Sequence, residues 1–232
     1  MKRTGMLIIL MAIHFYAAAQ STQTVKVNAG DDIAAAISSN GIYRFPSFVS
    51  GDILLKNGNH GTQLLNYNIL SDQMMYIDKK GDTLAIGIPD QIQKIIISDT
   101  GFYYYKKGCV EEIAYTPTAS LVVERKVSVH YQKKGAFGNS NGVGTGIESY
   151  TMLPAAASTY HLTVNEDAVI RKAITYFLFT SEGSLLPANK NNLIRLFPKN
   201  KENIESWLNT HKINFNKQSD LADLFGVAAA GN

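Results

Sequence analysis

The residues best suited to chemistry lie in a glycine-rich stretch from Gly135 to Gly146. Within it, residues 138–142 match the G-x-S-x-G pattern that presents a serine, here Ser140, as the nucleophile of a hydrolase. That chemistry needs a strand before the serine and a helix after it, and the segment VGTGIESYTMLP that follows has no helical pattern. Asp167 and His211 could complete a Ser–Asp–His order, but the strand–turn–helix context is missing. We therefore expect a flexible connection here and no catalytic residue.

Phosphate and metal chemistry fit the chain no better. A dinucleotide-binding loop needs G-x-G-x-x-G, and counting from Gly142 the last position is Ile147. The Gly-Lys-Ser/Thr of a P-loop does not occur. The histidines after residue 19 show no H-x-H or H-x-x-x-H spacing; they are His60, His130, His161 and His211. We expect no cofactor and no metal ligand set.

Two adjacent carboxylates, Glu111 and Glu112, lie in an expected strand. Side chains that are neighbours along a strand point to opposite faces of the sheet, so these two cannot act together as a general acid and base. Either one could still pair with a distant carboxylate. An enzyme would need a site assembled from dispersed residues.

Exposed tyrosine and asparagine side chains are the candidates for a ligand-binding surface. In FYYYK, Tyr103 and Tyr105 either offer contact area to a sugar or partner, or cover a sheet edge while Phe102 and Tyr104 face the core. In LNYNIL, Asn66 and Asn68 share one face, which is either solvent-facing or a small polar site.

Residues 1–19 have the pattern of a secretory signal peptide. Lys2 and Arg3 precede an apolar run from Met6 to Tyr16, and Ala17–Ala19 offers the small residues that a cleavage site requires. An apolar run of about eleven residues is too short for the roughly twenty that a membrane-spanning helix needs. Cleavage would lower the formal net charge from +3 to +1, which gives no electrostatic reason to bind nucleic acid. The prediction is a periplasmic or secreted protein with no transmembrane segment after cleavage.

Cys109 is the only cysteine, so no intramolecular disulfide can form and stability must come from packing. A free cysteine just after a turn is most often a small buried apolar residue, and that is the role we expect.

From about residue 41 to 131 the chain has the rhythm of consecutive strands. Gly and Asp recur every eight to twelve residues or so, and the segments between them are short and rich in Ile, Leu and Tyr. The segment 121–132 is expected to be a longer strand. The segment 167–179 could be a strand or a helix, and its β-branched and aromatic content favours a strand. Strands followed by helices, instead of alternating with them, argue against a parallel α/β sheet.

Helical patterns are confined to the two ends of the mature chain. Near the start, Asp31 is the expected N-cap of DDIAAAI and Gly41 the stop. Three short helices are expected within about 187–226, the first opened by Pro187 and the last ended by Gly226. Their apolar stripes are narrow, so they must pack on the sheet, and Trp207 is expected to be substantially buried there.

The sequence also resembles a family of secreted proteins of the Bacteroidota. The resemblance is carried by LNYNIL, MMYID and GDTLAI, then by KKGAFG and LPANKNNLIRLFPKN, and it extends over nearly the whole mature chain. It implies an extracytoplasmic location and a single family domain. It implies no activity, cofactor or site residue.

Together these observations predict a mainly β (α+β) fold. We expect residues 1–19 to be a signal peptide and residues 20–232 to form one β-rich domain, an antiparallel meander closing toward a barrel or sandwich with short C-terminal helices packed on it. The leading functional hypothesis is a non-catalytic protein that binds an envelope protein or a glycan. The alternative is an extracytoplasmic enzyme, similar to a glycan hydrolase.

Overall fold

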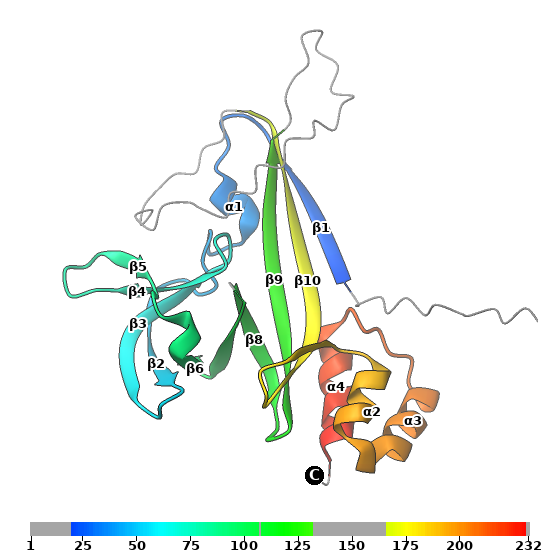
Figure 1. Ribbon diagram of the computed structural model, residues 1–232. Helices are drawn as coiled ribbons and strands as arrows, with labels where there is room; N and C mark the ends of the chain where they lie inside the picture. Colours follow the sequence, from blue (N-terminus) through cyan, green and yellow to red (C-terminus); the bar gives the residue numbers. More distant parts are fainter. Residues whose placement is uncertain (1–19, 107, 132–165, 231–232) are drawn as a thin grey trace, which may run out of the picture.

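The computed structural model describes residues 20–106, 108–131 and 166–230. Its strands form one 11-stranded antiparallel sheet in the order β1-β10-β9-β8-β7-β6-β2-β3-β4-β5, with β11 paired to β10 (Figure 1). The strands are β1 (Gln20–Val27), β2 (Val49–Leu55), β3 (His60–Asn68), β4 (Gln73–Ile77), β5 (Thr83–Ala85), β6 (Ile92–Ile97), β7 (Thr100–Tyr105), β8 (Gly108–Tyr115), β9 (Ala119–Tyr131), β10 (Ala168–Thr180) and β11 (Leu185–Pro187).

The expected mainly antiparallel β fold with short C-terminal helices is confirmed, but the sheet does not close. β5 and β1 end the strand order without pairing to each other. β1 was not anticipated from the sequence, although it pairs with β10 along its whole length. The pairing partner lies about 150 residues away, so no local pattern reports it.

The helices are α1 (Ile33–Ile37), α2 (Lys190–Leu196), α3 (Lys201–Thr210) and α4 (Gln218–Ala229), with short 3₁₀ turns η1 (Pro89–Gln91) and η2 (Pro198–Asn200). In Figure 1, α2, α3 and α4 gather at one end of the long β9–β10 hairpin, and α1 lies toward the other.

Three helix boundaries predicted from the sequence are wrong by a few residues. Asp32, and not Asp31, caps α1, because its Oδ1 accepts a hydrogen bond from the Ala34 N–H at 2.8 Å. Asn189, and not Pro187, opens α2, because Pro187 belongs to β11 and pairs with Phe177 in the sheet. α4 continues through Gly226 to Ala229, because the buried Ala228 extends its apolar face.

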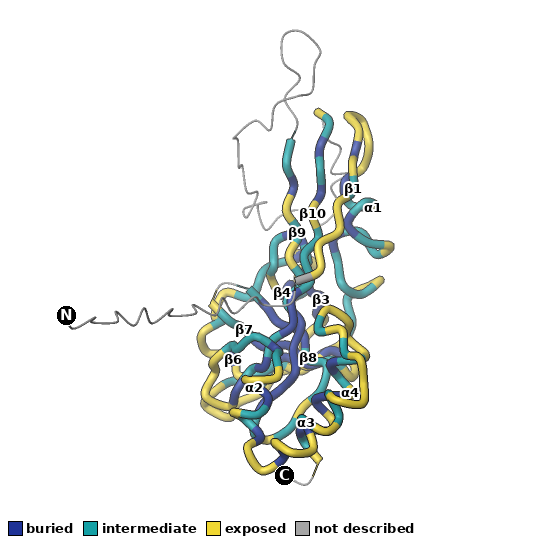
Figure 2. Tube along the Cα trace, turned by 90° about the vertical axis from the view of Figure 1, so that its right-hand side faces the viewer, coloured by how far each residue is buried: buried dark blue, intermediate teal, exposed yellow. Residues whose placement is uncertain are grey.

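On the side of the sheet that carries the helices, the core has three parts, spread along β9 and β10 and over β2–β8. Leu121, Leu178 and Ile204 belong to the cluster under the C-terminal helices, where Ile204 is fully buried. A second cluster joins Val129 and Ile170 to α1 and β1. A third fills the inside of β2–β8. Figure 2 shows the buried segments gathered where the shorter strands meet the helices, with mixed burial along the far half of the hairpin.

Trp207 is half-buried and packs against the core as expected, but it is not among the fully buried residues. Trp207 packs against the cluster under the C-terminal helices, and its ring stacks on the ring of His211, with ring centroids 4.4 Å apart. Ile204, one turn earlier in α3, takes the central position instead.

Candidate cationic pocket

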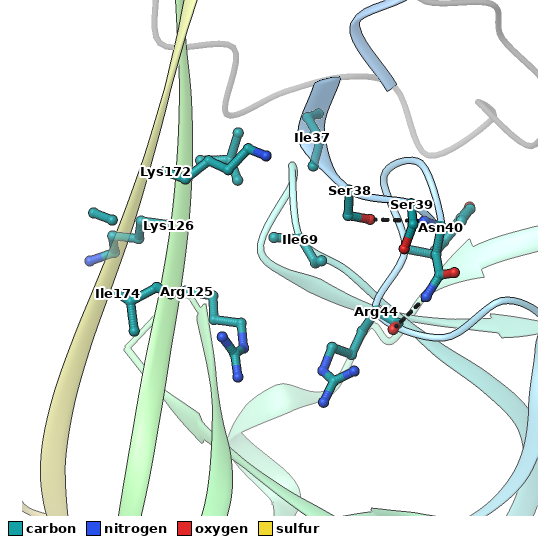
Figure 3. A pocket seen from close by; sticks show the side chains of 13 residues that line it. Ile37, Ser38, Ser39, Asn40, Arg44, Ile69, Arg125, Lys126, Lys172 and Ile174 are labelled. Carbon is teal, nitrogen blue, oxygen red and sulfur yellow. Dashed lines mark hydrogen bonds between the residues drawn. The ribbon is translucent and has the colours of Figure 1, made fainter. Parts of the chain in front are cut away.

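A pocket of about 370 Å³ lies between the β9–β10 hairpin and the segment that connects α1 to β2 (Figure 3). One wall is residues 37–40 with Tyr43 and Arg44, and Ile69 lies beside it. The opposite wall comes from residues 125–127 of β9 and 172–174 of β10. Along the hairpin, the pocket lies between the cluster under the C-terminal helices and the cluster that joins Val129 and Ile170 to α1.

The register of the hairpin decides which side chains reach the pocket. Arg125 pairs with Ile174, and Val127 pairs with Lys172. Residues that are directly opposite in an antiparallel pair project from the same face, so all four belong to the pocket side of the sheet. Figure 3 shows the Lys172 ammonium pointing into the pocket, whereas the Lys126 side chain points away on the far side of the hairpin.

Glu111 fixes two guanidinium groups at one end of the pocket. Arg44 donates from Nε to Oε2 at 2.8 Å and from Nη2 to Oε1 at 3.0 Å, and Arg125 donates from Nε to Oε2 at 3.3 Å. Glu111 is 7% exposed, while the side chains of Arg44 and Arg125 keep 34% and 24% of their surface. The bidentate geometry fixes the plane of the Arg44 guanidinium, whereas Arg125 is held by one longer hydrogen bond.

The charges around Glu111 also set its ionisation. Burial by itself raises the pKa of this carboxyl, but the hydrogen bonds and positive charges of Arg44 and Arg125 outweigh burial and bring the pKa below its usual value. Glu111 is therefore ionised at neutral pH and compensates one of the two guanidinium charges.

The remaining positive charge on the pocket is uncompensated within the described part of the chain. Its lining contains no Asp or Glu. Lys172 forms no ion pair with a described residue, and Arg125 uses only Nε toward Glu111. Lys126, in contrast, is paired with Glu124 at 2.9 Å on the other face. The pocket thus presents free N–H donors and a net positive charge.

A second polar network lies on the opposite face of the sheet, around Glu112. Lys94 donates to Glu112 Oε1 at 2.8 Å, the Tyr103 hydroxyl donates to Oε2, and Ser120 donates to Oε2 at 3.0 Å. Lys94 also lies over the rings of Tyr103 and Tyr115. Glu111 and Glu112 are therefore held on opposite faces by separate partners, as the strand alternation predicts.

The two asparagine candidates lie inside the protein. Asn66 is 1% exposed; its amide bonds the backbone of Phe45 and Ser47. The Asn68 Oδ1 accepts from the backbone N–H groups of Leu70 and Ser71. Both side chains position loops and neither lines the pocket.

The two tyrosine candidates differ from each other. Tyr103 is buried and stacks on Phe179, with ring centroids 4.7 Å apart. Tyr105 is half-buried beside Lys106, whose ammonium lies over its ring. Phe102 and Tyr104 point into the core between β2 and β8.

The remaining sequence candidates give no catalytic cluster. Ser140 and His161 lie outside the described residues. Asp167 accepts from the Ala29 N–H beside the start of β10, whereas His211 stacks on Trp207 among the C-terminal helices, at the other end of the hairpin in Figure 1. Among the described residues no group of three His, Cys, Asp or Glu side chains could hold a metal ion. In the same residues every helix is too short or too polar to cross a membrane.

Asp72 and Cys109 form a partly buried polar contact that ties the β3–β4 turn to β8. Asp72 Oδ1 accepts from the Tyr67 hydroxyl at 2.6 Å and from the Cys109 N–H at 2.9 Å. Burial raises the pKa of Asp72 and raises that of the Cys109 thiol. Cys109 is free and buried, as expected from the sequence.

The pocket residues were not singled out from the sequence. The one available signal was Arg125, which interrupts an otherwise apolar strand face of Val123, Val127 and Val129. A charged residue within an apolar stripe needs a partner, and the sequence does not name Arg44 and Glu111 as that partner. Comparisons with protein-family models, with curated proteins and with solved structures found no match to this chain.

Proposed function

We propose that the protein is a non-catalytic binding protein of the cell envelope, periplasmic or secreted, whose binding site is the pocket between the β9–β10 hairpin and residues 37–44. The observation that carries the proposal is the pocket itself. Its volume of about 370 Å³ lies in the range of small-molecule sites, and it combines apolar walls with a few fixed polar groups.

The composition of the walls favours binding of a small polar molecule. Ile37, Ile69 and Val127 supply apolar surface, and the Tyr43 hydroxyl has no hydrogen-bond partner among the described residues. Glu111 fixes the Arg44 guanidinium by two hydrogen bonds and contacts Arg125 by one, so Arg44 in particular loses little side-chain freedom when a ligand binds.

The electrostatics of Glu111 favour binding over hydrolysis. Glycoside hydrolysis uses two carboxyl groups on either side of one bond, and one of them must carry a proton. The lowered pKa of Glu111 keeps this carboxyl ionised, and Glu112 lies on the other face of the sheet. Neither carboxyl suits the role of general acid in this pocket.

A ligand screen by thermal shift tests the proposal. Monosaccharides, disaccharides, amino acids and dicarboxylates are offered to the wild-type protein, to Val127→Trp and to Ser128→Trp. Val127 lines the pocket, so tryptophan there fills it, whereas Ser128 is the next residue on the exposed opposite face.

The expected result is a stabilising ligand whose effect is lost in Val127→Trp and kept in Ser128→Trp. Stabilisation that survives in Val127→Trp would place binding elsewhere. Catalytic turnover of an oligosaccharide by the wild type would favour the enzyme alternative.

A further inference from the structure

The pocket carries more positive charge than its own groups neutralise, and this charge bears on the ligand. Arg44 and Arg125 share the single carboxylate of Glu111, and Lys172 adds a third cation from the neighbouring strand. Within the described part of the chain no Asp or Glu lines the pocket.

The register places the two free cations on one face of the hairpin, so that one ligand can contact both. Lys172 of β10 is opposite Val127 of β9, and Arg125 lies two residues before Val127 on β9. The two cations are therefore diagonal neighbours on one face of the hairpin. Diagonal neighbours in an antiparallel pair lie about 7–8 Å apart, which long side chains can bridge through a shared anion. Figure 3 shows the Lys172 side chain directed into the pocket and the two arginines converging at its end.

Holding three cations near the single carboxylate of Glu111 is unfavourable. Like charges in a partly desolvated pocket repel, and the repulsion is stronger where water is partly excluded. The pocket is therefore already organised for a negatively charged group, with the apolar walls of Ile37 and Ile69 beside it. Arginine forks match the geometry of carboxylate and phosphate oxygens.

We infer that the pocket binds a small organic anion through a carboxylate or phosphate group held between Arg125 and Lys172. The inference rests on the proposed function and specifies its ligand class. The anion accepts hydrogen bonds from the unused Nη groups of Arg125 and from the Lys172 ammonium, while the rest of the ligand lies on the apolar wall.

The test is isothermal titration of the full-length mature chain with four probes that differ in charge. These are glucuronate, glucose 6-phosphate, inorganic phosphate and glucose, so the carboxylate and phosphate sources are compared with a neutral sugar of the same ring. Lys172→Met is the main variant, because this replacement removes no ion pair between described residues of the protein. Arg171→Met is the matched control: Arg171 is the preceding residue, is exposed, and is on the opposite face of β10.

We expect glucuronate or glucose 6-phosphate to bind at least tenfold more tightly than glucose. Lys172→Met should weaken that binding by about tenfold or more, since a hydrogen bond to a charged group is lost. Arg171→Met should leave it within about twofold, and Lys172→Arg should restore most of it. Far-UV circular dichroism of each variant confirms that the fold is kept.

Three results overturn the inference and leave the proposed function standing. The first is equal affinity for glucose and its anionic relatives, and the second is anion binding that Lys172→Met leaves unchanged. The third is a neutral ligand in the thermal-shift screen that depends on Val127, with no binding of any anion. If no ligand of any charge binds the wild-type pocket, the proposed function and the inference fail together.

Discussion

Replacing Glu111 by glutamine tests whether this carboxylate holds the pocket and the fold together. The amide keeps the size of the side chain and one acceptor oxygen, but it removes the negative charge and turns an N–H₂ group toward a guanidinium. Arg44 and Arg125 would then face each other without compensation.

Removing one partner of a buried ion pair costs about 3–5 kcal/mol. The side chains of Arg44 and Arg125 keep 34% and 24% of their surface, so water recovers part of this cost. We expect Glu111→Gln to lower the free energy of unfolding by about 2–3 kcal/mol at pH 7. Glu124→Gln is the control, because its partner Lys126 is 61% exposed and such pairs contribute about 0–1 kcal/mol.

The pH dependence gives a second readout with a fixed sign. Because the folded-state pKa of Glu111 is lower than the usual 4.5, its contribution to stability is complete above that value and is lost as the pH falls through the folded-state pKa. The gap between wild type and Glu111→Gln should therefore shrink toward zero in acid.

Urea unfolding at pH 7 and in acid, followed by far-UV circular dichroism and by the fluorescence of the single tryptophan, measures both effects. A change smaller than about 0.5 kcal/mol at pH 7 would refute the reasoning. So would a gap that stays constant as the carboxyl is protonated.

Three further predictions concern buried or half-buried residues. Asp72→Asn should leave stability at pH 7 unchanged or raised, because an amide oxygen accepts the same two hydrogen bonds without a partly buried charge. Any gain should vanish as the pH falls through the raised pKa of Asp72, and a loss above about 1 kcal/mol in urea titration at pH 7 contradicts this. Ile204→Ala should lower the free energy of unfolding by about 2–5 kcal/mol, and by more than Trp207→Ala does, since Ile204 is fully buried and Trp207 is not. A larger loss for Trp207→Ala than for Ile204→Ala in urea unfolding would show the burial argument to be mistaken. Cys109 should resist iodoacetamide in the native protein and react in urea, because burial disfavours its thiolate; rapid native labelling seen by mass spectrometry is the contrary result.

The class of fold could be predicted because its determinants are local. Short Ile- and Tyr-rich segments between turn residues specify strands, and the period of two along a strand places Glu111 and Glu112 on opposite faces before any contact is known. The C-terminal helices follow from apolar spacing in the same way. Helix boundaries did not follow from the sequence: whether Asp31 or Asp32 caps α1, and whether α2 begins after Pro187 or after Asn189, depends on backbone geometry that composition does not encode.

Tertiary structure alone decided how far the sheet closes and where the pocket lies. β1 and β10 pair although they are far apart in the sequence, and β1 forms an edge of the sheet, which stays open. No local sequence pattern distinguishes an open sheet from a closed one. Arg44 meets Glu111 over 67 residues, and Lys172 joins Arg125 only through the register of the β9–β10 hairpin. Arg125 stands out in the sequence as a charge within an apolar strand face, but nothing in the sequence names Arg44, Glu111 or Lys172 as its neighbours. Their shared role exists because desolvation and Coulomb attraction act on distances in space, which the order of residues along the chain does not contain.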